Sequence, residues 1–170
     1  PASPLKGPGR KQRGAIIVDT SLSDKSVENI RKAWDFIKGE WPRFAENVDV
    51  HVIPEADFQR HIKVNNLYPD SAGYFDPIKN RIFVSQDVNK TPIHEQIDLL
   101  AHELKHGIQA ARKPAKWFNQ GGTLKNATDA EYRANPPEAD AIRAGETAAN
   151  RYLGPGSIRK AALDAKTALE

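Results

Sequence analysis

The sequence predicts an α+β domain with a small mixed β-sheet. Three observations lead to this prediction: strand-like runs at residues 15–18 and 48–52, a β-hairpin pattern over residues 73–85, and long amphipathic helical patterns at residues 23–41 and 92–111. The resulting order is strand, helix, strand, hairpin, helix, loop and a further C-terminal helix, which is typical of the α+β class.

The composition is that of one ordinary globular domain. The chain has 170 residues, of which 39% are hydrophobic and 28% charged, and this is enough for one domain with a proper core. No apolar run approaches the ~20 residues of a membrane span. Because cysteine is absent, any metal must be held by His, Asp or Glu. The chain begins Pro1-Ala2-Ser3 and contains no methionine, so we expect it to be part of a longer protein.

Positive charge is concentrated at the start of the chain. Residues 1–13 are rich in Pro and Gly and carry +4, whereas the remaining residues sum to −1. We expect a flexible basic tail here, a folded domain at residues 14–154, and a weakly anchored, partly helical tail at residues 155–170. Four charges attract nucleic acid only weakly, so nucleic acid is not the expected partner.

The first half of the chain predicts two strands around a helix. Apolar residues 15–18 indicate a buried strand, and the alternation at residues 48–52 indicates a half-buried one. The helix between them begins near Ser23 and ends before Pro42. Its apolar positions recur every three or four residues, at Val27, Ile30, Trp34, Ile37 and Trp41.

The clearest hairpin of the sequence lies at residues 73–85. Strand-like runs at residues 73–75 and 81–85 flank Asp76-Pro77-Ile78-Lys79-Asn80. Asp followed by Pro suits the first two positions of a type I turn, and Asn80 tolerates a left-handed backbone conformation.

Two helices follow the hairpin. Thr91 as N-cap and Pro92 at the first helical position open a long helix that ends at a loop, residues 112–130. Asn135-Pro136-Pro137-Glu138 opens another helix, which Gly154 closes. On a helical wheel, the long helix gathers one apolar stripe within about 80°, made by Ile93, Ile97, Leu100, Leu104 and Ile108.

The motif His102-Glu103-Leu104-Lys105-His106 lies mid-way along this long helix. His102 and His106 lie roughly opposite the apolar stripe, about one turn or ~6 Å apart along the axis. Two imidazoles at this spacing can bind one Zn²⁺ ion, and Glu103 can accept a proton from a water bound to it. The alternative is that these are ordinary polar residues sharing a helix, or hydrogen-bonded core histidines. Their position opposite the core stripe favours the metal.

A second, similar pattern precedes the motif. His94-Glu95-Gln96-Ile97-Asp98 nearly repeats it, but His94 lies two turns, about 12 Å, from His102. This separation is too large for the two histidines to share an ion, so we expect His94 to lie at the surface.

The predicted zinc site needs a third protein ligand. Glu138, in the first turn of the next helix, is the favoured candidate because its carboxylate can turn back toward the long helix. Asp140, Glu131 and Glu146 remain alternatives. Asn135 and Glu138 also form a capping-box-like pair, which would give Glu138 a structural role instead.

The residues "HELKH", preceded by "AGYFDPIKNRIFV" and followed by "EYRANPPEADA", resemble a minimal zincin metallopeptidase of the gluzincin type. The resemblance spans about residues 14–153 and is to the compact domains of bacterial polymorphic toxins, secreted effectors and large phage proteins. It implies a zincin-like fold in which His102, His106 and Glu138 bind zinc and Glu103 is the general base. It also implies a substrate lying along one hairpin strand, at Gly73 and Tyr74. Unlike the larger gluzincins, the chain has Ile142 rather than Asp four residues after Glu138.

The expected function is therefore that of a zinc endopeptidase domain. Glu103 would take the proton of the attacking water and pass it to the leaving amine. Tyr132 and Tyr152 flank Glu138, and Tyr132 is the candidate that stabilises the transition state, with packing in the core as its alternative role. We expect a protein or peptide substrate, a monomer, and a parent protein that is secreted or injected. The alternative is an inactive zincin-like or structural-zinc module that binds peptides.

Overall fold

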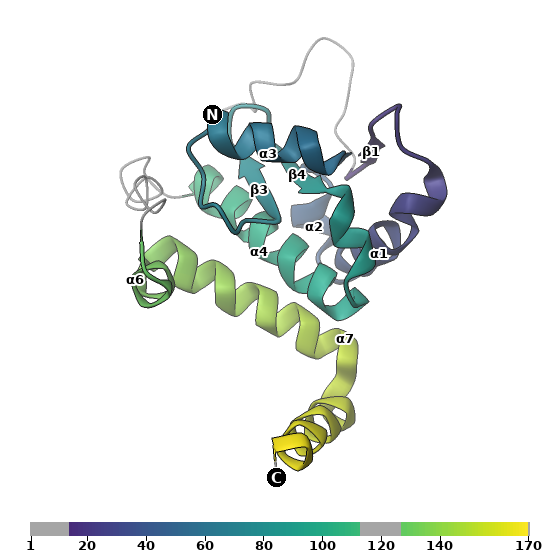
Figure 1. The fold of residues 1–170 in the computed structure, drawn as a ribbon, viewed down its shortest axis with the longest axis vertical. Helices are drawn as coiled ribbons and strands as arrows, with labels where there is room; N and C mark the ends of the chain where they lie inside the picture. The colour runs from purple at the N-terminus through teal and green to yellow at the C-terminus, as the bar shows by residue number, and fades with distance from the viewer. Residues whose placement is uncertain (1–13, 113–126, 170) are drawn as a thin grey trace.

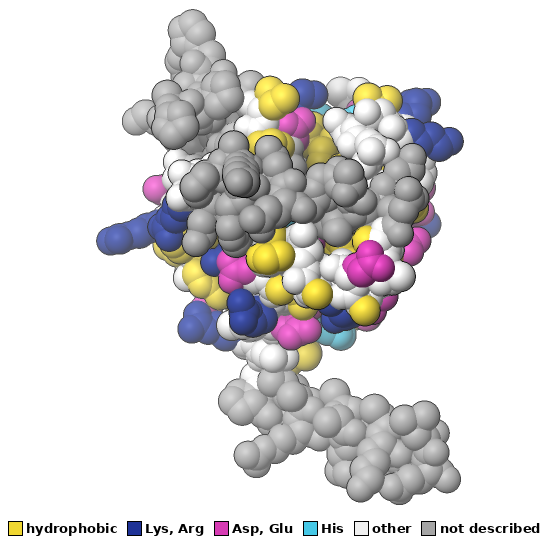
Figure 2. All heavy atoms as spheres, turned by 90° about the vertical axis from the view of Figure 1, so that its left-hand side faces the viewer, with side chains coloured by type: hydrophobic (Ala, Val, Ile, Leu, Met, Phe, Trp, Pro, Cys, Tyr) yellow, Lys and Arg dark blue, Asp and Glu magenta, His cyan; other side chains and the backbone are white. Residues whose placement is uncertain are grey.

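The computed structural model describes residues 14–112 and 127–169, and for residues 155–169 it describes the backbone alone. The predicted basic tail at residues 1–13 and most of the predicted loop at residues 112–130 lie outside the described residues. Within the described ranges, no helix is both long and apolar enough to cross a membrane. On the face shown in Figure 2, hydrophobic, acidic and basic side chains of the described residues are interspersed.

Four strands form one mixed sheet in the order β1-β2-β4-β3. β1 (Ile16–Val18), β2 (Asp49–Ile53) and β4 (Arg81–Ser85) run parallel to one another, and β3 (Gly73–Asp76) is antiparallel to β4. The α+β class and the small mixed sheet are thus confirmed. Among the described strands β3 pairs with β4 alone, so one strand of the predicted hairpin lies at the sheet edge.

The turn between β3 and β4 forms as the sequence predicts. One carboxylate oxygen of Asp76 accepts hydrogen bonds from the backbone N–H groups of Ile78 (2.9 Å) and Lys79 (3.0 Å). Asn80 adopts the left-handed conformation, with φ of 49°. These local interactions set the strand register, in which Tyr74 lies opposite Phe83.

The alternation of side chains along the strands divides the sheet into two faces. One face packs against α1 (Glu28–Glu40) and α4 (Ile93–Arg112), and its buried residues include Val50, Val52, Phe75, Ile82 and Val84. The other face packs against α3 (Glu55–Val64) through Ile53, Phe58, Ile62, Tyr74 and Phe83. Figure 1 shows α3 and α4 on opposite sides of the strands. The sequence analysis missed α3, because only Phe58 and Ile62 of this helix are buried in an otherwise polar segment.

Short helices refine several predicted boundaries. The first predicted helix is split into a 3₁₀ turn, η1 (Asp24–Val27), and α1. Pro42 does end α1, but it also starts a short helix, α2 (Pro42–Ala45). After β4 the chain forms a second 3₁₀ turn, η2 (Gln86–Lys90). The hydroxyl of Thr91 donates to the carbonyl oxygen of Val88 (2.8 Å), so Thr91 closes η2, and α4 begins at Ile93.

The apolar stripe predicted for α4 is confirmed as its core face. Ile97, Leu100 and Leu104 are buried, and Ile93 and Ile108 pack at the margins of the same cluster. This stripe orients α4 about its axis, and therefore decides which way the histidines of the motif point.

The last two helices cover the other side of α4. α6 (Asp129–Ala134), which the sequence analysis did not separate from the preceding loop, leads into α7 (Pro136–Leu169). α7 runs along α4 up to a kink at Gly154, where φ is 74°, as the predicted helix end at this glycine suggested (Figure 1). The two helices approach most closely at Gly145, where a Cβ atom would lie 2.7 Å from the backbone carbonyl oxygen of Asp98.

We predict that Gly145→Ala lowers the free energy of unfolding by about 1–3 kcal/mol, because the added methyl group must push α7 away from the backbone of α4. The matched control is Gly39→Ala in α1, where a Cβ atom would meet nothing within 4 Å. That control should raise stability by about 0.4–1 kcal/mol. Denaturant unfolding of both variants measures the difference, and equal stability of the two variants would show that Gly145 is not a close contact.

Candidate metal centre

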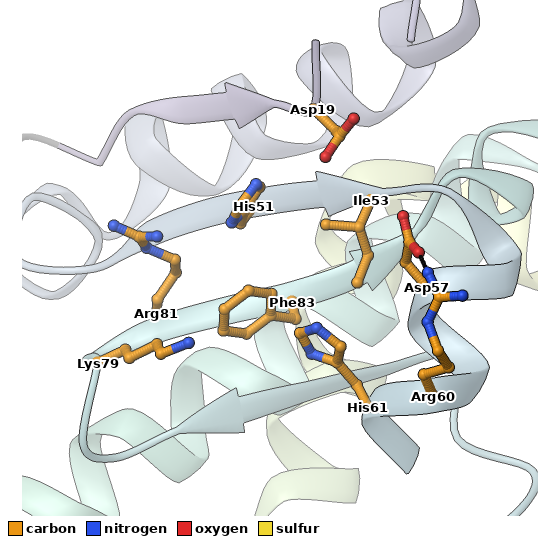
Figure 3. Close-up of a pocket in the computed structure, with 9 residues that line it drawn as sticks. All are labelled: Asp19, His51, Ile53, Asp57, Arg60, His61, Lys79, Arg81 and Phe83. Atoms are coloured by element: carbon orange, nitrogen blue, oxygen red, sulfur yellow. Dashed lines mark ion pairs between the residues drawn. The ribbon is translucent and has the colours of Figure 1, made fainter. Parts of the chain in front are cut away.

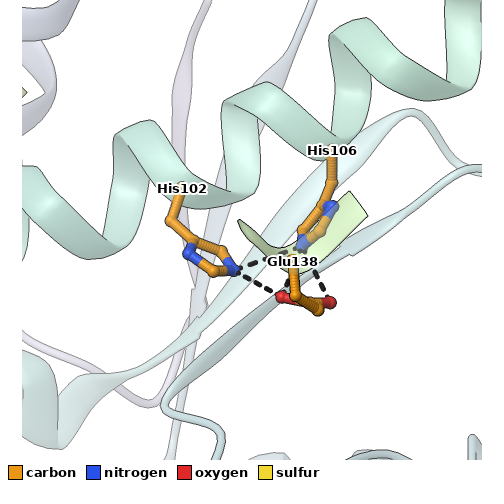
Figure 4. Close-up of side chains that lie close together, drawn as sticks. All are labelled: His102, His106 and Glu138. Atoms are coloured by element: carbon orange, nitrogen blue, oxygen red, sulfur yellow. Dashed lines mark hydrogen bonds and ion pairs between the residues drawn. The ribbon is translucent and has the colours of Figure 1, made fainter. Parts of the chain in front are cut away.

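His102, His106 and Glu138 converge on one point (Figure 4). Nε2 of His102 lies 3.0 Å from Oε2 of Glu138, Nε2 of His106 lies 3.2 Å from the same oxygen, and the two nitrogens are 3.2 Å apart. One ligand atom from each residue lies within 4.8 Å of the other two. The arrangement is therefore a possible metal-binding triad, as the spacing of the motif predicted.

Two helices bring these ligands together. The histidines project from one side of α4, one turn apart, and Glu138 projects toward them from the first turn of α7. The capping-box alternative for Glu138 is not formed: its carboxylate faces the histidines, and Oδ1 of Asn135 is buried without a hydrogen-bond partner among the described residues.

The structure places the other candidate third ligands elsewhere. Asp140 lies 3.6 Å from the ammonium group of Lys105 and accepts a hydrogen bond from Gln109. Glu131 bonds to Thr128, which caps α6, and Glu146 is exposed. His94 lies in the first turn of α4, outside the triad, as predicted.

Glu103 is buried between α4 and the sheet edge. The helical wheel predicted that His102 and His106 lie opposite the core stripe, yet His106 is only 9% exposed, and Glu103 beside it only 7%. α7 and β3 cover this side of α4, which a wheel of one helix does not include. Burial raises the pKa of the Glu103 carboxyl, although the neighbouring histidines oppose the shift, and the backbone N–H of Phe75 in β3 donates to it.

The hydrogen bonds of the triad shift the pKa values of His106 and Glu138. Burial disfavours charge on Glu138, but hydrogen bonds from His102 and His106 hold the pKa of its carboxyl well below the usual range. Burial likewise disfavours charge on His106, but the hydrogen bond to Glu138 and the nearby carboxylates raise its pKa to about 9. A metal ion that binds here must displace the proton of His106.

Gln109 holds His106 in the orientation that metal binding needs. Its Nε2 donates to the carbonyl oxygen of Pro137 (2.9 Å), which can only accept, so its Oε1 faces Nδ1 of His106 at 2.8 Å. Nδ1 of His106 therefore keeps its proton, and Nε2, on the triad side, is the nitrogen that would bind a metal once its own proton is displaced. Gln109 is 2% exposed and connects α4 directly to the start of α7. The sequence analysis missed Gln109, although its position three residues after His106 was a usable signal.

The two tyrosines named from the sequence have different environments. Tyr132 donates a hydrogen bond to Glu138 and stacks on Tyr68, with ring centroids 4.9 Å apart. Burial and the charge of Glu138 raise the pKa of Tyr132, so it remains a protonated hydrogen-bond donor. Tyr152 is 43% exposed and packs edge-on against Phe36, so it does not take part in the site.

The predicted substrate strand is adjacent to the site. Ser85 N–H donates to the carbonyl oxygen of Ala72, and bonded pairs alternate along an antiparallel ladder, so the backbone of Gly73 faces away from β4. Tyr74 has the opposite orientation: its backbone faces β4, and its hydroxyl lies 2.6 Å from Nδ1 of His61, beneath α3. The outer edge of β3 is thus formed by the backbone of Gly73 and Phe75, and of these the N–H of Phe75 is bonded to Glu103.

No protein-family model, no curated protein and no solved structure matches this chain. An assignment of function must therefore rest on the chemistry of the site and on the motif that it contains.

We predict that Gln109→Leu lowers metal affinity by about 10–100-fold, because the Nδ1 proton of His106 loses its acceptor in a buried position. The matched control is Gln96→Leu. Gln96 is an equally buried glutamine of α4 that bonds to the backbone of Asn89 and Thr91, away from the triad. Chelator competition measures affinity, and equal affinities of the two variants would show that Gln109 does not position His106.

Proposed function

We propose that this chain is a zinc-dependent endopeptidase domain. The observation that carries the proposal is the convergence of His102, His106 and Glu138 beside a buried Glu103. Two imidazoles and one carboxylate, without sulfur, are a ligand set typical of catalytic zinc. Ligands about 2.0–2.1 Å from a tetrahedral ion are about 3.3 Å apart, and the three donor atoms here are separated by 3.0–3.2 Å.

Glu103 is the proposed general base. Zinc, when bound, would lower the pKa of a water molecule and polarise a peptide carbonyl group. Burial raises the pKa of Glu103, which makes this carboxylate a stronger proton acceptor than an exposed glutamate. Its hydrogen bond with the N–H of Phe75 orients the carboxylate at the edge of β3. From this position Glu103 takes a proton from water and delivers it to the amine that leaves.

Tyr132 is the proposed donor to the oxyanion of the transition state. Its phenol stays protonated, it lies against Glu138, and its ring is fixed by stacking on Tyr68. A preorganised donor at such a position lowers the barrier because negative charge develops on the carbonyl oxygen.

The free edge of β3 supports an extended peptide as the substrate. Added as a further strand, a peptide bonds through its main chain and so is held without regard to its sequence. Phe75, in the same strand, bonds to Glu103, and a peptide along β3 would therefore pass close to the proposed base. A place in a toxin or effector protein rests on the resemblance of the motif alone.

A structural-zinc or inactive peptide-binding module is the alternative function. A structural site does not require a buried carboxylate beside its ligands. Burying Glu103 costs free energy, and a role in proton transfer accounts for its presence there. Loss of hydrolysis in Glu103→Gln separates the two functions, because both of them include bound zinc.

The purified protein is expected to bind one Zn²⁺ per chain, and His102→Ala or His106→Ala should abolish stoichiometric binding. His94→Ala is the control, since His94 lies on the same helix but outside the triad. Elemental analysis after dialysis provides the measurement. Zinc content that is unchanged in the His102 and His106 variants would rule out this site.

Glu103→Gln should keep zinc and fold but reduce peptide hydrolysis by at least ~10²–10⁴-fold, because it removes the proton acceptor. Glu95→Gln, an exposed position of the same helix, is the control and should cleave normally. Turnover of a denatured protein substrate provides the assay. A Glu103→Gln variant that is as active as the wild type would exclude this mechanism. A zinc-loaded wild-type protein that binds peptides without cleaving them would support the alternative module.

The role of the β3 edge is tested by comparing Gly73→Pro with Gly73→Ala. Both variants add a Cβ atom near the side chain of Val84, but only proline removes the outward N–H. Gly73→Pro should raise KM about tenfold or more relative to Gly73→Ala, with zinc content unchanged. Equal KM values in the two variants would mean that the substrate does not pair with β3 at this position.

A further inference from the structure

A pocket lies on the face of the sheet that is turned away from α4 and from the metal triad (Figure 3). Its volume is about 340 Å³, and its floor includes Phe83 of β4 and His51 of β2. These residues alternate along their strands with Ile82, Val52 and Val84, which face α4. The pocket is therefore separated from the metal triad by the sheet itself, and neither the proposed peptidase reaction nor the motif uses it.

One end of this pocket carries positive charge. Figure 3 shows Arg81 and Lys79 together at this end, and among the described residues neither forms an ion pair with a carboxylate. Lys79 extends over the ring of Phe83, with its ammonium nitrogen 5.4 Å from the ring centroid. At the opposite end Arg60 is paired with Asp57, so its charge is compensated.

Two polar atoms that line the pocket have no hydrogen-bond partner. Nε of Arg81 and Nδ1 of His51 are both buried, and no described residue bonds to either. A guanidinium group stays charged at any physiological pH, and leaving its donors unpaired in a half-buried position costs free energy. A ligand that offers acceptor oxygens would remove this cost.

The two imidazoles of the pocket are affected by the same positive charge. Burial, and then the charge of Arg81, lower the pKa of His51, while burial and Lys79 lower the pKa of His61. Both rings are consequently neutral at pH 7. Tyr74 stays protonated, and its hydroxyl lies 2.6 Å from Nδ1 of His61, its one side-chain hydrogen-bond partner among the described residues. The hydroxyl therefore donates to Nδ1, and Nε2 of His61 carries the ring proton as a donor.

Asp19 is the acidic residue of the pocket that is not paired with a cation. Its carboxylate accepts hydrogen bonds from the backbone N–H (3.0 Å) and hydroxyl (2.7 Å) of Ser21. It lies above β2, on the side away from Lys79 (Figure 3). The two carboxylates that line the pocket therefore lie away from Arg81 and Lys79. Asp76, opposite Arg81 in the strand register, offsets part of the charge at this end, and its carboxylate accepts from the backbone N–H groups of Ile78 and Lys79. Two cations against one carboxylate leave this end positive.

We propose that this pocket binds a phosphate monoester, with the phosphate group at Arg81 and Lys79 and the organic part extending toward His61. A phosphate group suits this end because its several oxygens match the guanidinium fork and the ammonium group together, whereas a carboxylate offers only two. The volume lies within the range of small-molecule sites, about 300–1,000 Å³, and leaves room for more than the phosphate itself. The proposal is independent of the peptidase function.

The test is an NMR titration of the zinc-loaded protein with inorganic phosphate, glycerol 3-phosphate and, as an uncharged control, glycerol. Saturable shifts of the His51 and His61 imidazole signals are expected with both phosphates, with the ester binding more tightly. The His102 and His106 signals report separately on any phosphate that reaches the metal. Arg81→Gln and the exposed Lys79→Gln should each weaken binding about tenfold or more, while Arg133→Gln, an exposed arginine of α6 paired with Asp129, should not.

Each outcome decides the proposal. Binding that saturates, favours the ester and is lost in both pocket variants supports it. Tighter binding of free phosphate than of the ester overturns the assignment to a monoester. An absence of shifts at His51 and His61, or shifts that persist unchanged in Lys79→Gln, overturns the site as a whole, and because Lys79 is exposed this variant is not expected to unfold.

Discussion

The burial of α4 on two opposite sides is the constraint on which the rest of this structure depends. One side packs its apolar stripe onto α1 and the sheet, including the edge strand β3, and the other lies beneath α7. Such packing requires small residues where the elements cross. A Cβ atom at Gly145 would lie 2.7 Å from the Asp98 carbonyl oxygen, and one at Gly107 would lie 3.0 Å from the Phe75 ring. The candidate metal triad lies where α4 meets α7, beside the edge strand β3.

This burial has an electrostatic cost that the site must offset. Glu103, His106 and Gln109 are each less than one-tenth exposed, and polar groups in such positions destabilise a fold unless they are bonded. The bonds are supplied from three elements: Phe75 of β3 to Glu103, Gln109 of α4 to His106, and Glu138 of α7 to both histidines. The same bonds that make burial tolerable also orient the groups, as the proposed hydrolysis would require.

The pleat of the sheet separates two chemically different surfaces. Successive residues of β4 point to opposite faces of the sheet. Ile82 and Val84 pack toward α4, whereas Phe83 lines the pocket proposed to bind phosphate on the other face. A change on one face can therefore leave the other face intact. The edge strand β3 belongs to both sides, since Phe75 packs toward α4 and Tyr74 bonds to His61 beneath α3.

The local sequence was sufficient for the features that depend on neighbouring residues. The hairpin turn at Asp76 and Asn80, the apolar stripe of α4 and the separation of His102 from His106 all follow from spacing along the chain. The sequence favoured Glu138 as the third ligand but left Asp140, Glu131 and Glu146 open. The exclusion of these alternatives, the hydrogen bond to Pro137 that turns Gln109 toward His106, and the burial of Glu103 did not follow from it. These features depend on where α7 and β3 pack against α4, and no periodicity within α4 encodes that packing. The helix α3 was likewise beyond local reasoning, because two buried residues stabilise it only once the sheet is there to receive them.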